Sequence, residues 1–91
     1  MHEVDSTILD VRTPAEFAQG RLPGAINHDL STHFRERIAP LDRDGVYAVY
    51  CRTSECALQA LVLMKELGFE QAYYLDGGFV AWQRAGGQVT R

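Results

Sequence analysis

The sequence predicts an α/β protein in which helices cover both faces of a mainly parallel sheet. Short apolar segments alternate along the chain with segments of helical periodicity, as they do in β-α units. Residues 46–50 are apolar on both faces, which is typical of a central parallel strand. Cys51 follows that strand directly, and parallel sheets bind their ligands beyond the carboxyl ends of their strands. The predicted fold therefore places a cysteine at the edge of the sheet where chemistry is expected.

Local signals predict the first strand and the first helix. Residues 7–11 are mostly β-branched and aliphatic, which predicts a short buried strand. Residues 14–19 predict a short helix. Thr13 can cap its start, Pro14 suits the first helical position, and Gly20 ends it.

The middle of the chain predicts a second strand, a second helix and a polar connection. Residues 22–24 turn the chain before a brief strand at residues 25–27. Residues 31–38 carry apolar side chains at helical spacing and predict a helix. Residues 42–45 are polar and turn-forming, and they lead into the central strand at residues 46–50.

The last part of the chain predicts a long helix, a strand and a short helix. Residues 57–67 have apolar side chains at helical intervals, and Gly68 is the expected C-cap. Residues 72–75 predict a strand. The glycine pair at residues 77–78 opens a tight turn into a last helix at residues 79–85.

Length and composition indicate a single small globular domain over residues 1–91. Such a chain can bury one modest core, and its 46% hydrophobic and 23% charged residues are ordinary for a domain of this size. The net charge of −3 argues against nucleic acid as a partner. No apolar run approaches the roughly 20 residues that span a bilayer, so no membrane partner is expected. The start of the chain lacks the features of a secretory signal, which makes a cytoplasmic location the expectation.

Cys51 is predicted to be a nucleophile. A strand that leads through a short turn into a helix presents backbone N–H groups and the positive end of the helix dipole to that turn. These groups stabilise a thiolate and attract an anionic substrate. The chain has 2 cysteines, too few for a disulfide scaffold, so a reduced and reactive thiol is the better interpretation. The alternative is a buried structural thiol, because free cysteine is among the most buried residue types.

Several segments together resemble the rhodanese-like sulfurtransferase family. Residues 8–12, 16–17 and 20–27 look like its amino-terminal signature, and residues 75–82 look like its carboxy-terminal one. Cys51 stands where the family has its persulfide-forming cysteine. The similarity covers nearly the whole chain.

The resemblance implies a three-layer rhodanese-like fold, with the active loop after a central strand, and a thiosulfate sulfurtransferase activity that needs no cofactor. Cys51 would take the outer sulfur of a small anionic donor such as thiosulfate and hold it as a persulfide. Cyanide, a small thiol or a protein thiol partner would then accept that sulfur in a ping-pong cycle. Two positions depart from the family pattern. Arg21 stands where the family often has His, and Ser54 stands where it often has Gly, a residue that tolerates more backbone angles.

Substrate-binding residues are expected in the loop after Cys51 and behind the first strand: Arg52, Thr53, Ser54, Glu55, Cys56 and Arg12. Arg52 either binds an anionic donor or is a solvent-facing charge. Arg12 either lies near the substrate anion or stabilises the loop through an ion pair with Asp10 or Glu16. Ser54 either offers its hydroxyl to the persulfide or caps the next helix. The helix dipole gives the Glu55 carboxylate a favourable position, which needs no catalytic role.

Cys56 forms a Cys-x4-Cys pair with Cys51 across the loop. As a resolving thiol it would convert a persulfide into an internal disulfide, or it would receive the sulfur itself. The motif also resembles loops of rhodanese domains that are attached to transcriptional regulators. The plainer interpretation is a small residue packed at the helix start, because spacing alone does not bring two sulfurs within bonding distance.

Two other classes of function stay open. A non-catalytic module that senses oxidants or reactive sulfur would use the Cys51 and Cys56 pair. A phosphatase or arsenate-reducing enzyme is disfavoured, because cysteine phosphatases need an arginine six positions after the cysteine, where this chain has Ala57. No metal site is expected, because His28 and His33 show no ligand spacing with the cysteines and are interpreted as surface residues.

Overall fold

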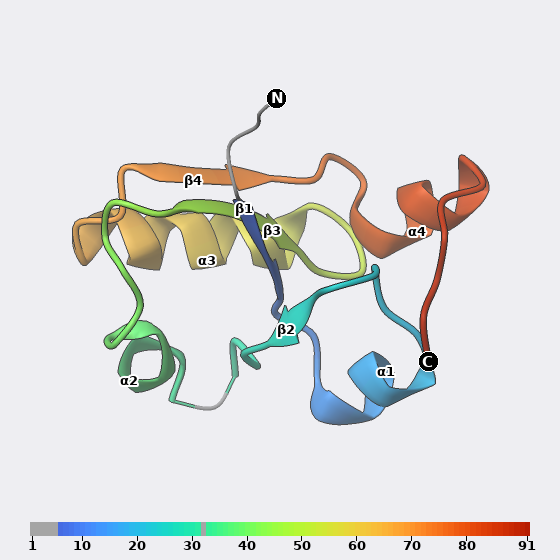
Figure 1. Cartoon of the computed structure of the whole chain (residues 1–91), viewed down its shortest axis with the longest axis horizontal. Helices are drawn as coiled ribbons and strands as arrows, with labels where there is room; N and C mark the ends of the chain where they lie inside the picture. Colours follow the sequence, from blue (N-terminus) through green and yellow to red (C-terminus); the bar gives the residue numbers. More distant parts are fainter. Residues whose placement is uncertain (1–5, 32) are drawn as a thin grey trace.

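A parallel sheet of four strands organises the computed structural model, which describes residues 6–31 and 33–91. The strands lie in the order β2-β1-β3-β4, and their bounds are β1 (Ser6–Asp10), β2 (Ile26–Asn27), β3 (Val46–Tyr50) and β4 (Gln71–Tyr74). The helices α1 (Pro14–Gln19), α2 (Phe34–Ile38), α3 (Glu55–Glu66) and α4 (Gly78–Arg84) lie in the connections and after the last strand (Figure 1). The prediction of an α/β fold with a parallel sheet is confirmed.

β3 is an inner strand, as the apolar pattern of both its faces predicts. It pairs in parallel with β1 on one side and with β4 on the other. Tyr47, Val49 and Tyr50 are all buried. The chain leaves β3 at Cys51, so the loop that follows lies at the carboxyl end of the sheet between two neighbouring strands.

Two apolar clusters, one on each face of the sheet, give the fold its three layers. On one face, side chains of α2 and α3 pack against β1 and β3, with Phe34, Ile38, Val49 and Met64 among the most buried members. On the other face, Phe79 and Trp82 of α4 pack with Tyr50. Because the sheet is covered on both sides, the three-layer prediction is confirmed.

Most predicted elements agree with the structure to within two residues. The helix at residues 14–19 and the strand at residues 46–50 have the predicted bounds, and the predicted N-cap of α1 forms a capping box between Thr13 and Glu16. α3 begins at Glu55, two residues before the prediction, so the loop after Cys51 is short.

The second helix is the clear error among the predicted elements. Residues 31–38 are predicted to be helical, but α2 begins at Phe34. His33 precedes it with a φ of 54°, a left-handed conformation that a continuous helix cannot contain. Residue 32 of the predicted helix lies outside the described residues.

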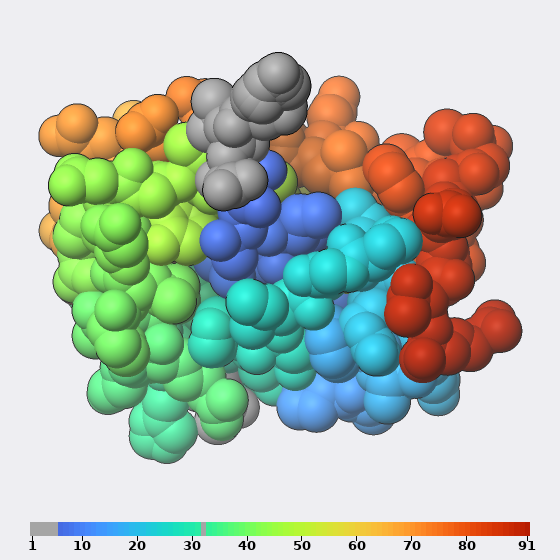
Figure 2. Space-filling view, in the orientation of Figure 1, coloured from blue at the N-terminus to red at the C-terminus, as the bar shows by residue number. Residues whose placement is uncertain are grey.

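The end of the chain pairs with the segment after α1. Arg21 and Thr90 exchange two backbone hydrogen bonds of 2.9 and 2.8 Å in an antiparallel bridge. The Arg91 guanidinium also donates to the carbonyl of Gln19 at 2.9 Å. Figure 2 shows the red C-terminal residues lying against the blue and cyan surface that follows α1. This contact joins two segments that the sequence pattern does not relate.

Candidate active site

Cys51 occupies the turn between β3 and α3, with its sulfur among polar atoms of the loop. The Sγ atom accepts a hydrogen bond from the Ala57 N–H at 3.2 Å, and its thiol donates to the Thr53 carbonyl at 2.7 Å. The residue is only 2% exposed and also contacts the apolar cluster beneath the loop. The loop therefore encloses a sulfur that the sequence predicts to be a reactive nucleophile. Its hydrogen-bond partners are backbone groups of that loop.

The loop amides around Cys51 are free to bind an anion. Within the described residues, the N–H groups of Thr53, Ser54, Glu55 and Cys56 donate to no protein acceptor. These residues include the N-cap and first turn of α3, a helix of 12 residues whose dipole places partial positive charge here. Thr53 and Glu55 are exposed. The predicted arrangement of N–H donors after the strand is present.

The start of α4 fixes the backbone of this loop. The Phe79 N–H donates to the Cys51 carbonyl at 2.8 Å, and the Val80 N–H donates to the Arg52 carbonyl at 3.1 Å. Gly78 makes this approach possible. A Cβ atom there would lie 2.5 Å from the Cys51 carbonyl oxygen, and the residue has a φ of +61°.

Ser54 links the loop to the turn before α4. Its hydroxyl accepts from the Gly77 N–H at 2.8 Å and donates to Asp76 Oδ1 at 3.2 Å. The expectation that this hydroxyl caps α3 is wrong, because it is occupied by the neighbouring turn. Ser54 has a φ of −86° and a ψ of −26°, ordinary for any residue, so its replacement of the family's frequent glycine causes no backbone strain.

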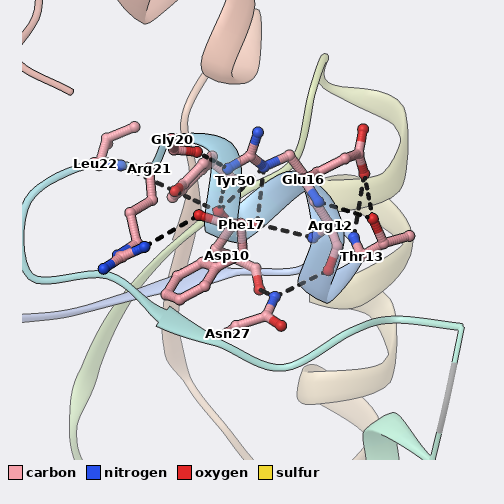
Figure 3. A network of polar contacts seen from close by, with 10 residues as sticks. All are labelled: Asp10, Arg12, Thr13, Glu16, Phe17, Gly20, Arg21, Leu22, Asn27 and Tyr50. Atoms are coloured by element: carbon pink, nitrogen blue, oxygen red, sulfur yellow. Dashed lines mark hydrogen bonds and ion pairs between the residues drawn. The ribbon is translucent and has the colours of Figure 1, made fainter. Parts of the chain in front are cut away.

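A buried polar network lies behind the loop (Figure 3). Asp10 is fully buried and forms an ion pair with Arg12, whose Nη2 lies 2.7 Å from Oδ2. The Tyr50 hydroxyl donates to the same oxygen at 2.6 Å and accepts from the Leu22 N–H at 3.1 Å. Burial raises the pKa of Tyr50, and the hydrogen bond to Asp10 raises it further. Tyr50 therefore remains a hydrogen-bond donor over the physiological range.

Arg12 forms an ion pair at the end of β1 and stabilises that end of the strand. Its guanidinium donates to both Asp10 oxygens and to the Gly20 carbonyl, and it lies 4.2 Å from the ring centroid of Phe79. Its ion-pair partner is Asp10, while Glu16 is engaged in the capping box with Thr13. Asn27 completes this region by donating to the carbonyls of Asp10 and Arg12.

A positively charged pocket of about 310 Å³ opens beside the loop. Arg12, Arg52 and Arg91 line it together with Phe79 and one carboxylate, Glu16. Arg52 is exposed, and its guanidinium forms no ion pair with any other described residue. Arg52 therefore brings a free positive charge to the entrance of the site.

Cys56 lies on the first turn of α3 with its side chain exposed, while Cys51 is buried, and both thiols are free. Partial burial raises the pKa of Cys56, and the charge and side-chain hydrogen bond of Cys51 raise it further. Glu55 and Glu16 add smaller contributions of the same sign. The two thiols thus interact, although Cys56 is not packed in the core.

The two histidines of the described residues belong to no metal centre. His33 is exposed as predicted, but His28 is half-buried with a buried Nδ1 that has no hydrogen-bond partner, so its interpretation as a surface residue is wrong. Among residues 6–31 and 33–91, no group of three or more His, Cys, Asp or Glu side chains is arranged to bind a metal ion. In the same residues, every helix is too short or too polar to cross a bilayer.

The family model described as Rhodanese-like domain matches residues 1–85 of this chain. The chain belongs to the rhodanese-like family.

Similar proteins agree with this assignment. A sulfurtransferase of Allochromatium vinosum is 39% identical over 90% of this chain and 76% of that protein. The thiosulfate sulfurtransferase GlpE of Shewanella oneidensis is 35% identical over 86% of this chain and 76% of its own length. The crystal structure of the rhodanese-like domain of the Alr3790 protein from Anabaena sp. matches 100% of this chain and 86% of that chain, with a TM-score of 0.90 and 30% identity. This rhodanese-like domain is thus related to sulfurtransferases.

Sequence reasoning missed several residues that shape this rhodanese-like site. The sequence predicts a turn at Gly78 without a link to the active loop, and it assigns Tyr50 only to a central strand. A tyrosine directly before the cysteine, with a buried aspartate on the neighbouring strand, was the available signal for the polar network. No local signal pointed to Arg91, because the pairing of the chain end with Arg21 is a long-range contact.

Proposed function

We propose that this domain transfers sulfane sulfur through a persulfide on Cys51. The Cys51 thiolate attacks the outer sulfur of thiosulfate, the S–S bond of the donor breaks, and sulfite leaves with the bonding electron pair. Cys51 then carries the extra sulfur. Cyanide or a thiol attacks this sulfur in the second half of the cycle, and Cys51 leaves again as a thiolate.

The position of the Cys51 sulfur is the observation that carries this proposal. Sγ lies 3.2 Å from the Ala57 N–H at the start of α3, and the preceding loop amides have no protein acceptor in the described residues. Backbone donors fixed in this way stabilise negative charge without reorganising during the reaction. They favour the anionic outer sulfur of a Cys51 persulfide.

Arg52 and its pocket support an anionic donor. The Arg52 charge has no ion-pair partner among the described residues, and it lines the pocket beside the loop. Arg12 lines the same pocket but is already paired with Asp10. We therefore assign donor attraction mainly to Arg52 and assign to Arg12 the positioning of the strand end behind the loop.

The loop composition supports sulfur transfer over phosphate chemistry. The position at which a cysteine phosphatase needs its arginine is Ala57, which is fully buried. The methyl group of this alanine cannot bind phosphoryl oxygens as an arginine does. Glu55 adds negative charge to the same turn. A doubly charged phosphoryl group would be poorly bound here.

Steady-state kinetics with thiosulfate and cyanide test the proposal. A persulfide cycle gives parallel lines in double-reciprocal plots at several fixed cyanide concentrations, because donor and acceptor react in separate steps. A non-catalytic sensing module would give no turnover. Intersecting lines would show that both substrates must bind together, which would contradict the covalent cycle.

A further inference from the structure

We propose that Cys56 takes the sulfur from the Cys51 persulfide and presents it at the surface to thiols of other proteins. This inference rests on the proposed function of Cys51. It assigns to the second cysteine a relay step that sulfur transfer to cyanide does not require.

Unequal exposure of the two thiols is the first argument. Cys51 is 2% exposed, with its sulfur between the Thr53 carbonyl and the Ala57 N–H. Cys56 is exposed on the first turn of α3. A small anion needs little room to reach an enclosed sulfur, but a cysteine on another folded protein needs an accessible one. Only Cys56 meets that requirement in this loop.

Distance is the second argument. The Cys51 Sγ lies 3.2 Å from the Ala57 nitrogen, which is two covalent bonds from the Cα of Cys56. Standard bond lengths then place Sγ within about 6 Å of that Cα. The Cys56 side chain and the S–S bond of about 2 Å in a Cys51 persulfide together cover this distance.

The free amides of the loop indicate where the outer sulfur of a Cys51 persulfide is stabilised. The N–H groups of Ser54, Glu55 and Cys56 have no acceptor among the described residues. An anionic outer sulfur on Cys51 is therefore stabilised on the side of the loop that leads to Cys56.

The relay step is balanced without an added oxidant. The Cys56 thiol loses its proton to solvent, and its thiolate forms a bond to the outer sulfur of the Cys51 persulfide. The bond between that sulfur and Cys51 breaks, and Cys51 Sγ leaves as a thiolate that accepts the Ala57 N–H. Attack on the inner sulfur would instead release hydrosulfide and leave a disulfide. The enclosure of Sγ by the loop disfavours that second route.

Peptide mapping tests the relay directly. The protein is treated with thiosulfate, separated from the donor, alkylated with iodoacetamide in denaturant and digested with trypsin. Cleavage after Arg52 places Cys51 in the peptide of residues 44–52 and Cys56 in that of residues 53–65. The relay predicts one extra sulfur on residues 53–65 of the wild type. In Cys56→Ser the sulfur stays on residues 44–52, and in Cys51→Ser neither peptide gains it.

The contrary outcomes are distinct. Sulfur confined to residues 44–52 of the wild type would overturn the relay and leave the proposed function intact. Sulfur on residues 53–65 of Cys51→Ser would mean direct loading of Cys56, and linked peptides with sulfide release would mean a disulfide. Both results overturn the relay. If neither wild-type peptide gains sulfur, the proposed function fails and the relay fails with it.

A second measurement compares two acceptors. The relay predicts that Cys56→Ser lowers the ratio of the transfer rate to reduced thioredoxin over that to cyanide by about tenfold or more. Gln59→Ser, on the exposed next turn of α3, is the matched control and should leave the ratio unchanged. An unchanged ratio in Cys56→Ser would show that protein thiols reach Cys51 without help.

Discussion

The carbonyl oxygen of Cys51 accepts a hydrogen bond from the Phe79 N–H at 2.8 Å, so the first residue of the active loop is attached to the start of α4. This bond and the neighbouring one from Val80 to Arg52 hold the carbonyls of Cys51 and Arg52 against α4, while the Thr53 carbonyl accepts from the Cys51 thiol. Amide N–H groups are then left on the side where an anion can bind. The geometry of the site thus depends on a segment 28 positions later in the chain than Cys51.

Gly78→Ala tests this attachment. A Cβ atom would lie 2.5 Å from the Cys51 carbonyl and 2.6 Å from that of Thr53, so the loop or α4 must move. We expect a loss of about 2–4 kcal/mol in the free energy of unfolding and a large fall in sulfur transfer. Urea unfolding and the thiosulfate and cyanide assay measure the two effects.

Gly86→Ala is the matched control for backbone conformation. Gly86 has a φ of +81°, but a Cβ there would meet nothing within 4 Å. We expect only the strain of a left-handed alanine, about 1 kcal/mol, with transfer unaffected. Equal losses in the two variants would show that close packing at Gly78 does not shape the loop.

Tyr50→Phe tests the buried network behind the loop. Removing the hydroxyl deprives Asp10 of a donor and leaves the buried Leu22 N–H without an acceptor. We expect a loss of about 1–3 kcal/mol in the free energy of unfolding, because an unpaired buried polar group carries its full desolvation cost. Tyr47→Phe is the control, since its hydroxyl donates to the carbonyl of exposed Asp42, which water can reach. A smaller loss in Tyr50→Phe than in Tyr47→Phe would contradict the importance of the network.

Arg52→Gln tests the attraction of an anionic donor. The substitution removes a positive charge that lines the pocket beside the loop and that has no ion-pair partner among residues 6–31 and 33–91. We expect the KM for thiosulfate to rise roughly threefold to tenfold with a smaller change in kcat, and the effect to shrink at high salt. Arg35→Gln removes the same charge from the exposed ion pair with Glu66 and should leave KM unchanged. Similar KM values in both variants would remove Arg52 from donor binding.

The pH dependence of the relay follows from the surroundings of Cys56. Burial first, then Cys51, Glu55 and Glu16 raise the pKa of this thiol above its ordinary value of 9.0. The thiolate is the attacking form, so transfer of sulfur to residues 53–65 should become faster from about pH 7 to about pH 9. Rapid acid quenching followed by peptide mapping measures this rate.

Glu16→Gln sharpens the pH test. The amide oxygen can still accept from Thr13 and preserve the capping box, while one negative charge near Cys56 is lost. The rate profile should shift to lower pH. A shift to higher pH, or a rate that falls as pH rises, would contradict attack by the Cys56 thiolate.

Local sequence signals were sufficient for the elements and for the position of the cysteine, but not for the contacts that shape the site. The periodicity of β3 and the capping signals at Thr13 and Pro14 act within a few residues, and both predictions are confirmed. The role of Gly78 depends on a loop far away in sequence, and Ser54 bonds to the α4 turn instead of its own helix. Such contacts form only when the sheet brings distant segments together.

The buried polar network around Asp10 also depends on contacts that local sequence signals do not predict. Asp10 accepts hydrogen bonds from Arg12 and Tyr50, because a buried carboxylate at the end of a strand needs donors. Its pairing with Tyr50 on the adjacent strand follows from the parallel register of Asp10 opposite Tyr50, which the sequence does not specify. The pairing of Asp10 with Tyr50 is therefore known only from the structure. The same holds for Arg52, which has no ion-pair partner among the described residues.

Intact-mass spectrometry after incubation with thiosulfate tests the central claim most directly. The account predicts that Cys56→Ser gains the mass of one sulfur atom and the wild type gains at least one, that cyanide removes the added sulfur, and that Cys51→Ser gains nothing. Retention of the sulfur adduct in Cys51→Ser, or its absence from the wild type, would contradict a persulfide on Cys51.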